Sequence, residues 1–230
     1  VFFHLKNSPD QIDWKEISEP ETLSNALSEW VVQRYSEYLN ANDPHKALEF
    51  FSRFKILCAV KVGSLGVKAI NRLAEQILSG KGLIDLDKLS THPWYRGRPV
   101  LITRNDYNLQ LYNGDVGIIL PDSNRKNAFR AFFKEESGTV RDIALPLLPD
   151  HETVFAMTVH KSQGSEFARV LLILPDRNSP LLTRELLYPA ITRARKTVEI
   201  WGRKEIFAAA VKRQIKRTSG LAEALLDGDR

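Results

Sequence analysis

The sequence predicts an α/β protein whose parallel sheet is interrupted by a small all-β insertion. Three observations lead to this prediction. The apolar run Lys55–Val60 leads through a glycine-containing loop into a helical pattern, as in strand–loop–helix units. Residues from about 91 to 150 show several short strand patterns and no helical period. Strand and helix patterns alternate again from residue 151 onward.

The first part is expected to contain two amphipathic helices ahead of a buried strand. Val1–Leu5 has the pattern of a strand, and the turn at Ser18–Glu21 opens a helix. The apolar side of that helix recurs at three- and four-residue spacing: Leu23, Leu27, Trp30, Val31, Tyr35 and Tyr38. A second, short helix begins at Asp43. Lys55–Val60 then has the pattern of a strand covered on both faces, and Val67–Ile77 that of a helix.

The insertion is expected to consist of short strands joined by tight turns. Pro99–Thr103 and Val116–Leu120 are joined through Asn113-Gly114, a dipeptide that tolerates the positive φ angles of such turns. Ala128–Phe133 and Thr139–Leu145 form a second predicted hairpin. The predicted division is a first α/β part at 1–90, the insertion at 91–150, a second α/β part at 151–217 and a tail at 218–230.

The second α/β part has a clear alternation of elements. Its predicted strands are Val154–Val159, Val170–Leu174 and Thr197–Trp201. Its predicted helices are Leu181–Thr192 and Lys204–Lys216, and apolar residues at helical spacing give the second of them a buried side.

Composition excludes several classes of protein. The 230 residues are 43% hydrophobic and 27% charged, which is too apolar for a disordered chain. The single cysteine, Cys58, excludes an internal disulfide framework and a zinc site built from several cysteines. No apolar run approaches the ~20 residues that span a bilayer, and a signal-peptide layout is absent. We therefore expect a cytosolic protein or subunit.

The net charge of +5 is concentrated in the last third of the chain. Residues 151–230 hold 14 Lys and Arg against 9 Asp and Glu, whereas the charges balance over residues 1–150. This asymmetry favours a polyanionic partner, either a nucleic acid or a nucleotide phosphate. A solvated basic helix explains the charge equally well, so charge alone does not decide between the two interpretations.

Thr158–Phe167 carries side chains suited to phosphate binding. The segment follows a predicted strand, is expected to open a helix, and contains His160, Lys161 and Gly164. Backbone N–H groups at a helix start favour anions, and a glycine lets a phosphate approach the backbone closely. A polar loop with a capping serine explains the same residues.

Tyr188–Lys196 ends a predicted helix immediately before a strand. Arg193 and Arg195 lie two residues apart, so they leave the helix end in different directions. An arginine fixed on rigid structure can stabilise a transferring phosphoryl group, because its planar guanidinium bonds two oxygens at once. Capping of the helix by basic residues is the alternative.

Together these two segments resemble motifs V and VI of the superfamily 1 DNA helicases. Thr158–Phe167 is similar to T-x-H-K-[SA]-Q-G-x-E-F, and Leu186–Arg195 to L-[LV]-Y-[TV]-A-[IV]-T-R-A-[RK]. Ile56–Asn71 resembles motif IV of the RecD-type branch, with its G-x-x-G-V-x-x-x-N. Trp94–Asp106 and Leu111–Gly117 resemble the SH3-like insertion of that branch. The four matches occur in order across most of the chain.

The resemblance implies a RecA-like, P-loop NTPase-type second motor lobe that carries an SH3-like insertion. Such helicases couple ATP hydrolysis to 5′–3′ movement on single-stranded DNA, and their first lobe supplies the Walker motifs. The sequence contains no G-x-x-x-x-G-K-[ST] and no Asp-Glu pair after a predicted strand. We therefore expect that the chain does not hydrolyse ATP by itself, and that ATP with Mg²⁺ is bound mostly by another lobe.

The resemblance also assigns roles to single residues. Arg193 matches the arginine finger that reaches the γ-phosphate, with Arg195 as the second choice. The positions that match nucleotide contacts are Gln163, Gly164 and Glu166. The positions that match DNA contacts are Thr158, His160, Lys161 and Ser162. No metal ligand is expected, and the two segments are expected to lie side by side with Arg193 pointing outward.

Pro189 departs from the family pattern, which has Thr or Val at that position. Proline lacks an N–H group and disfavours the helical conformation of the residue before it. We therefore expect the helix to kink at Pro189 or to begin anew there, which affects the direction of Arg193.

The partners implied by the resemblance are single-stranded DNA and the other subunits of an exodeoxyribonuclease V complex, RecB and RecC. The implied function is that of a helicase subunit in a RecBCD-type helicase–nuclease of the bacterial cytoplasm, acting in double-strand break repair and recombination. The alternative is a non-enzymatic module, in which the insertion and its α/β platform dock other subunits or DNA. It explains the insertion but not the joint presence of the two motif segments. A nuclease is unsupported, because no cluster of carboxylates has metal-ligand spacing.

Overall fold

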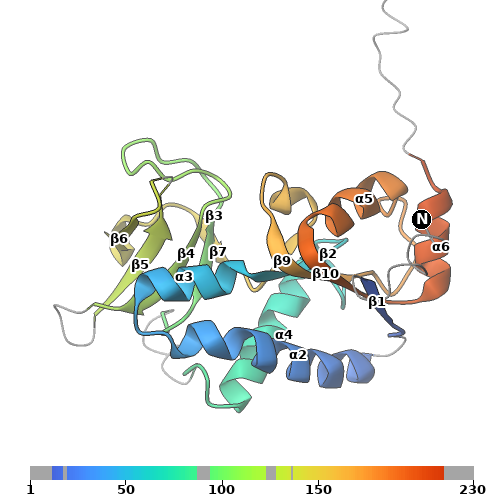
Figure 1. Cartoon of the computed structure of the whole chain (residues 1–230), viewed down its shortest axis with the longest axis horizontal. Coiled ribbons are helices and arrows are strands. Elements are labelled where there is room, and N and C mark those ends of the chain that lie inside the picture. Colours follow the sequence, from blue (N-terminus) through green and yellow to red (C-terminus); the bar gives the residue numbers. More distant parts are fainter. Residues whose placement is uncertain (1–11, 18–19, 87–93, 123–127, 136, 215–230) are drawn as a thin grey trace, which may run out of the picture.

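A computed structural model describes residues 12–17, 20–86, 94–122, 128–135 and 137–214, which form two five-stranded sheets. Figure 1 shows the two sheets next to each other along the longest axis of the molecule, and helices cover the sheet on the right. The strand predicted at Val1–Leu5 and the tail at 218–230 lie outside the described residues.

The first sheet is parallel and has the strand order β1-β10-β9-β2-β8. Its strands are β1 (Ile12–Lys15), β2 (Phe54–Cys58), β8 (Ala156–Thr158), β9 (Phe167–Ile173) and β10 (Ala194–Trp201). All of its pairings are parallel, which confirms the predicted α/β class. β9 and β10 each begin three residues earlier than predicted, whereas the strand predicted at Val154–Val159 is reduced to β8.

Side chains of this sheet alternate between two hydrophobic cores on its opposite faces. On β2, Ile56 and Cys58 belong to the core that includes α2, α3 and α4, and Leu57 belongs to the core that includes α5 and α6. Leu171 and Leu172 on β9 divide in the same way. Every residue of β2 is buried, as the continuous apolar pattern predicted.

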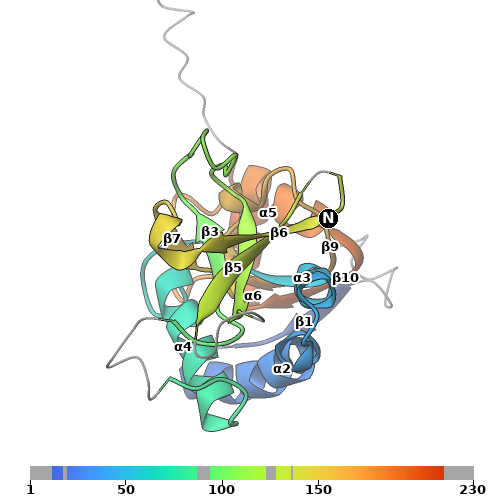
Figure 2. The same cartoon turned by 90° about the vertical axis from the view of Figure 1, so that its left-hand side faces the viewer.

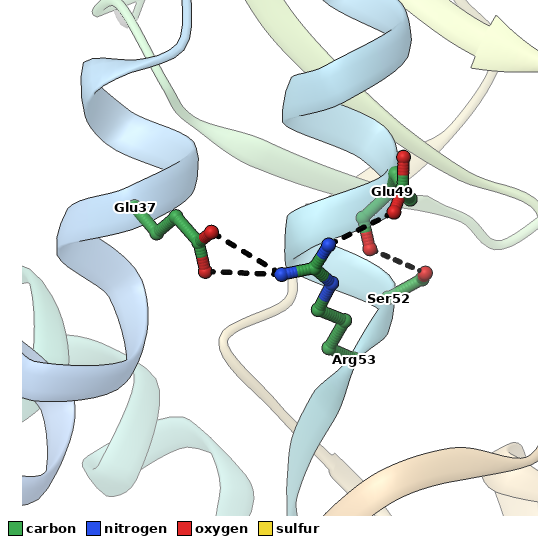
Figure 3. A network of polar contacts seen from close by, with 4 residues as sticks. All are labelled: Glu37, Glu49, Ser52 and Arg53. Atoms are coloured by element: carbon green, nitrogen blue, oxygen red, sulfur yellow. Dashed lines mark hydrogen bonds and ion pairs between the residues drawn. The ribbon is translucent and has the colours of Figure 1, made fainter.

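The helices on the first face are α2 (Pro20–Asn40), α3 (Pro44–Ser52) and α4 (Val67–Gly80). The whole predicted apolar side of α2 is buried. Helix α3 begins where predicted, because the Asp43 carboxylate accepts a hydrogen bond from the His45 backbone N–H at 2.9 Å. Arg53 donates to Glu37 of α2 at 3.2 Å and to Glu49 of α3 at 2.9 Å (Figure 3), so the two helices are joined immediately before β2.

The helices on the second face are α5 (Arg184–Thr192) and α6 (Lys204–Lys212). The prediction that α5 begins at Leu181 is wrong, because the Arg213 guanidinium bonds the carbonyl oxygens of Ser179 and Leu182 and holds the preceding loop in a non-helical form. The prediction that α6 continues to Lys216 is also wrong, since Arg213 has extended dihedrals and ends the helix.

Helix α5 runs through Pro189 without a new start, so that part of the prediction is wrong. Proline removes its own N–H from the hydrogen-bond ladder and crowds the carbonyl one turn before it. The last turn remains bonded, because the Arg193 N–H donates to the Pro189 carbonyl at 3.1 Å. The Thr192 hydroxyl adds bonds to the carbonyls of Tyr188 and Pro189 at 3.1 and 3.2 Å.

The second sheet is antiparallel and has the strand order β6-β5-β4-β3-β7 (Figure 2). Its strands are β3 (Pro99–Ile102), β4 (Val116–Pro121), β5 (Phe129–Lys134), β6 (Val140–Ala144) and β7 (His151–Thr153), with a 3-10 turn at Leu145–Leu147. The predicted turn forms, with Gly114 at φ +108°. The sheet extends beyond the predicted insertion, because β7 pairs with β3. Its SH3-like character stays a prediction.

Buried polar side chains fix the chain where it returns from the second sheet to the first. Lys55 donates to the carbonyl of Val154 at 3.4 Å, and the Tyr35 hydroxyl donates to the carbonyl of Phe155 at 2.7 Å. The Asn71 side chain bonds both the N–H and the carbonyl of Ala156, at 2.8 Å each. Burial raises the pKa of Tyr35 well above its usual value and lowers that of Lys55 well below it, so neither group ionises easily.

Candidate functional site

The segment between β8 and β9 runs the length of the parallel sheet. Cys58 pairs with both Thr158 and Ile173, so the end of β8 is level with the end of β9. Phe167, where β9 begins, lies about 20 Å back along that strand at ~3.3 Å per residue. Residues 159–166 therefore connect the carboxyl edge of the sheet to its amino edge.

This distance explains why the helix that Thr158–Phe167 is expected to open does not form. Eight residues of α-helix extend only ~12 Å, at 1.5 Å per residue, whereas an extended chain of that length covers ~27 Å. The segment therefore contains a single 3-10 turn, η3 (His160–Ser162), and is otherwise extended or turned. The polar groups predicted on a helix start lie instead on a crossing chain.

The first half of the segment lies at the carboxyl edge and holds the residues predicted to contact DNA. His160 is exposed, and the Thr158 hydroxyl accepts from the Lys161 N–H at 3.3 Å. Ser162 differs from the prediction, because its side chain is fully buried and its hydroxyl donates to the Val159 carbonyl at 2.7 Å. Ser162 therefore stabilises the turn and has no surface for a DNA contact.

A pocket of about 530 Å³ opens beside Thr158 and His160. Lys61 lines it from the end of β2, and Leu181 and Thr183 line it from the loop before α5. The Thr183 hydroxyl is buried and has no hydrogen-bond partner within the described ranges. The carboxyl ends of parallel strands are where ligands of α/β proteins usually bind, so this pocket belongs to the candidate site.

The second half of the segment makes a tight turn at the amino edge. Gln163 has φ −60° and ψ 134°, Gly164 has φ +85°, and the Ser165 N–H donates to the Ser162 carbonyl at 3.0 Å, as in a type II turn. Nothing lies within 4 Å of the position a Gly164 Cβ would take. The turn itself therefore requires the glycine. Gln163 and Glu166 are exposed beside it.

The two motif segments lie side by side, as predicted. The Phe167 N–H donates to the Arg193 carbonyl at 2.8 Å, and Nη1 of Arg193 donates to the Ser165 carbonyl at 3.2 Å. Arg193 is half-buried, and its Nε has no partner among the residues that the structure describes. Arg195 is exposed, and its Nε donates to the Glu166 carboxylate at 2.7 Å. Arg193, expected to point outward, is therefore partly enclosed by its own lobe, and Arg195 is the more exposed of the two.

The second sheet contributes to the site in a way that sequence reasoning missed. Lys161 forms an ion pair with Glu152 of β7, with Nζ and Oε1 2.6 Å apart. The Asn113-Gly114 turn faces residues 160–165 across a cleft of about 530 Å³. Asn113 and Gly114 carry a turn signal in the sequence, and Glu152 carries no signal beyond its charge.

The described residues contain neither a cluster of potential metal ligands nor a helix suited to crossing a membrane. No group of three or more His, Cys, Asp or Glu side chains is arranged there to hold a metal ion. Within the same ranges, no helix combines the length and the apolar character that a membrane span requires.

The chain is similar to several known proteins. The family of UvrD-like helicase C-terminal domains matches residues 153–200. RecBCD enzyme subunit RecD of Mycobacterium tuberculosis (strain CDC 1551 / Oshkosh) is 36% identical over 217 residues, covering 94% of this chain and 36% of that protein. The ATP-dependent RecD2 DNA helicase of Deinococcus radiodurans is 29% identical over 173 residues, 74% of this chain and 23% of that protein. The Pif1 helicase of Candida albicans superposes with a TM-score of 0.44 and 15% identity, over 85% of this chain and 57% of that one.

The parallel sheet, the crossing segment and the matched family define a helicase C-terminal domain. Within that class, the chain belongs to the RecD family and carries its C-terminal region. It spans about a third of the length of the first curated relatives that it matches.

Proposed function

We propose that the chain is the C-terminal motor lobe of an ATP-dependent DNA helicase that moves 5′–3′. The observation that carries the proposal is the contact between the two motif segments, in which Arg193 leaves the carboxyl end of α5 and reaches Ser165 in the glycine turn. A guanidinium carries five N–H donors and the bond to Ser165 uses one of them, so Arg193 can also bond an anion such as a nucleotide phosphate. The lobe completes a nucleotide site whose Walker motifs come from another lobe.

In this proposal the two halves of segment 158–166 bind different ligands. Gln163, Gly164 and Glu166 contact the nucleotide beside Arg193, and ATP with Mg²⁺ supplies the phosphoryl group whose transfer drives movement. Thr158, His160 and Lys161 contact phosphates of single-stranded DNA, which carry no sequence information and therefore suit a translocating protein. The same short chain holds both groups of residues, so it couples the two ligands.

The resemblance to a RecBCD enzyme subunit extends the proposal to partners. The chain acts with RecB and RecC in an exodeoxyribonuclease V complex of the bacterial cytoplasm, in double-strand break repair and recombination. The exonuclease activity belongs to the complex, and this chain contributes the motor.

Replacement of Arg193 tests the proposal in the native full-length protein. R193A should lower DNA-stimulated ATP hydrolysis by about 10³-fold or more, as loss of an arginine finger does, and leave binding of single-stranded DNA unchanged. R184A, at the other end of α5, is the matched control. Normal ATP hydrolysis by R193A would refute the assignment. If R195A loses ATP hydrolysis while R193A keeps it, the role belongs to Arg195.

A docking module is the second candidate function. It is favoured by Tyr107 and Tyr112 in the loop between β3 and β4, which are 75% and 48% exposed and pack edge to face at 6.3 Å. Exposed aromatic side chains are typical of interaction surfaces. If the protein binds single-stranded DNA, and this binding weakens with salt and is lost in H160A, the result supports the motor lobe. If neither salt nor H160A changes the binding, the result supports docking.

A further inference from the structure

Lys161 already has an anionic partner inside the protein. Its ammonium lies 2.6 Å from the Glu152 carboxylate, and the two side chains are 32% and 39% exposed. The pair joins the crossing segment to the second sheet. A residue proposed to bind DNA phosphate is therefore paired with a carboxylate of the same chain.

Strand β7 holds Glu152 in place. Glu152 pairs with Leu101 of β3, and its neighbours His151 and Thr153 point to the opposite face, where the His151 ring stacks on Trp94 at 5.3 Å. The buried polar side chains that bond residues 154–156 fix the chain directly after β7. The position of the carboxylate relative to the crossing segment is therefore set by the fold.

The space beside the ion pair is open. The cleft between the Asn113-Gly114 turn and the crossing segment is lined by Leu101, His160 and Lys161 among others. A strand of DNA that contacts His160 therefore has access to Lys161 from this cleft. The ammonium can exchange its carboxylate partner for a phosphate, because both present charged oxygen acceptors.

We propose that Glu152 occupies the place of a DNA phosphate at Lys161, so that the second sheet lowers the affinity of the crossing segment for DNA. The inference rests on the proposed DNA-binding role of this segment and adds its regulation. Bound DNA displaces Glu152 and releases the segment from β7. Any partner that moves β7 changes the affinity for DNA through the same pair.

Variants of the native full-length protein that each remove one charge test the inference. The measurement is the affinity for a fluorescent oligo-dT strand over a series of salt concentrations, without nucleotide. E152Q should tighten binding about two- to fivefold, the range set by an ion pair of this exposure. K161Q should weaken binding and reduce the slope of log affinity against log salt by about 0.7, as loss of one phosphate contact does. E135Q is the matched control, because Glu135 pairs with Arg141 of the same sheet at 3.6 Å.

The double variant decides between competition and general electrostatics. If Glu152 acts through Lys161, E152Q brings no gain in a K161Q background, and E135Q brings none in either background. Equal gains with and without Lys161, or no gain from E152Q in a protein that binds DNA, would overturn the inference alone. A wild-type protein that shows no salt-dependent binding would overturn the proposed function, and the inference with it.

Discussion

Replacing Asn71 should destabilise the strand that leads into the crossing segment. β8 is an edge strand of the described sheet and pairs with β2 on one side. On its other side, the Asn71 carboxamide donates to the Ala156 carbonyl and accepts from the Ala156 N–H, each at 2.8 Å. The Asn71 Nδ2 group also donates to the Val67 carbonyl at 3.0 Å, which fixes the orientation of the amide. Asn71 thus takes the place of a neighbouring strand.

The magnitude follows from the groups that lose their partner. N71A leaves an N–H and a carbonyl of Ala156 unpaired, and that residue is 1% exposed. Each buried unpaired group costs about 1–3 kcal/mol, so the free energy of unfolding should fall by about 2–6 kcal/mol. N71D should lose at least as much despite its nearly equal size, because a carboxylate oxygen then faces the carbonyls of Val67 and Ala156.

Urea unfolding followed by tryptophan fluorescence measures this change, and amide hydrogen exchange at Ala156 should accelerate in parallel. Q76A, an exposed amide on the same helix, is the control and should differ little from wild type. The reasoning is refuted if N71A unfolds within about 0.5 kcal/mol of Q76A, or if N71D is as stable as wild type.

Three further changes have expected outcomes. K55M removes a buried ammonium but also the donor of the buried Val154 carbonyl, so its effects on the free energy of unfolding oppose each other and its pH dependence is the informative measurement. Because burial lowers the pKa of Lys55, the unfolded chain binds the proton more tightly, and wild-type stability rises with pH toward 10.5; urea titrations should show that rise reduced in K55M. G164A should lower the free energy of unfolding by about 1–2 kcal/mol through its φ of +85° alone, and G164N by less, in thermal melts. Burial raises the pKa of Cys58, so a maleimide should label that thiol only after unfolding; fast labelling of the native protein would contradict this burial.

Elements with a strong local pattern were predictable from the sequence. The spacing of apolar residues defines the buried side of α2, and the continuous apolar run defines β2, because burial on one or two faces leaves a period in the sequence. The start of α5 was not predictable in this way. It depends on Arg213, which lies 31 residues beyond Leu182 and takes the loop carbonyls that a longer helix would use.

The two motif segments of the candidate site were predictable, but several of their contacts and the residues that the second sheet contributes were not. The motif resemblance brought Arg193 and the glycine turn together, and the structure places them in contact. The helix that Thr158–Phe167 is expected to open does not form, because strand registers fix the distance that the segment must cross, and registers leave no local signal. The pairing of Asn71 with Ala156 joins residues 85 positions apart, which no local pattern indicates.

The second sheet is part of the motif geometry, because one short stretch of chain belongs to both. Residues 151–153 form its edge strand β7, residues 154–156 are bonded by buried polar side chains, and residues 158–166 cross the parallel sheet to Arg193. A packed interior transmits small displacements instead of absorbing them. A shift of β7 therefore moves the start of the crossing segment and, through Glu152, the charge that Lys161 meets.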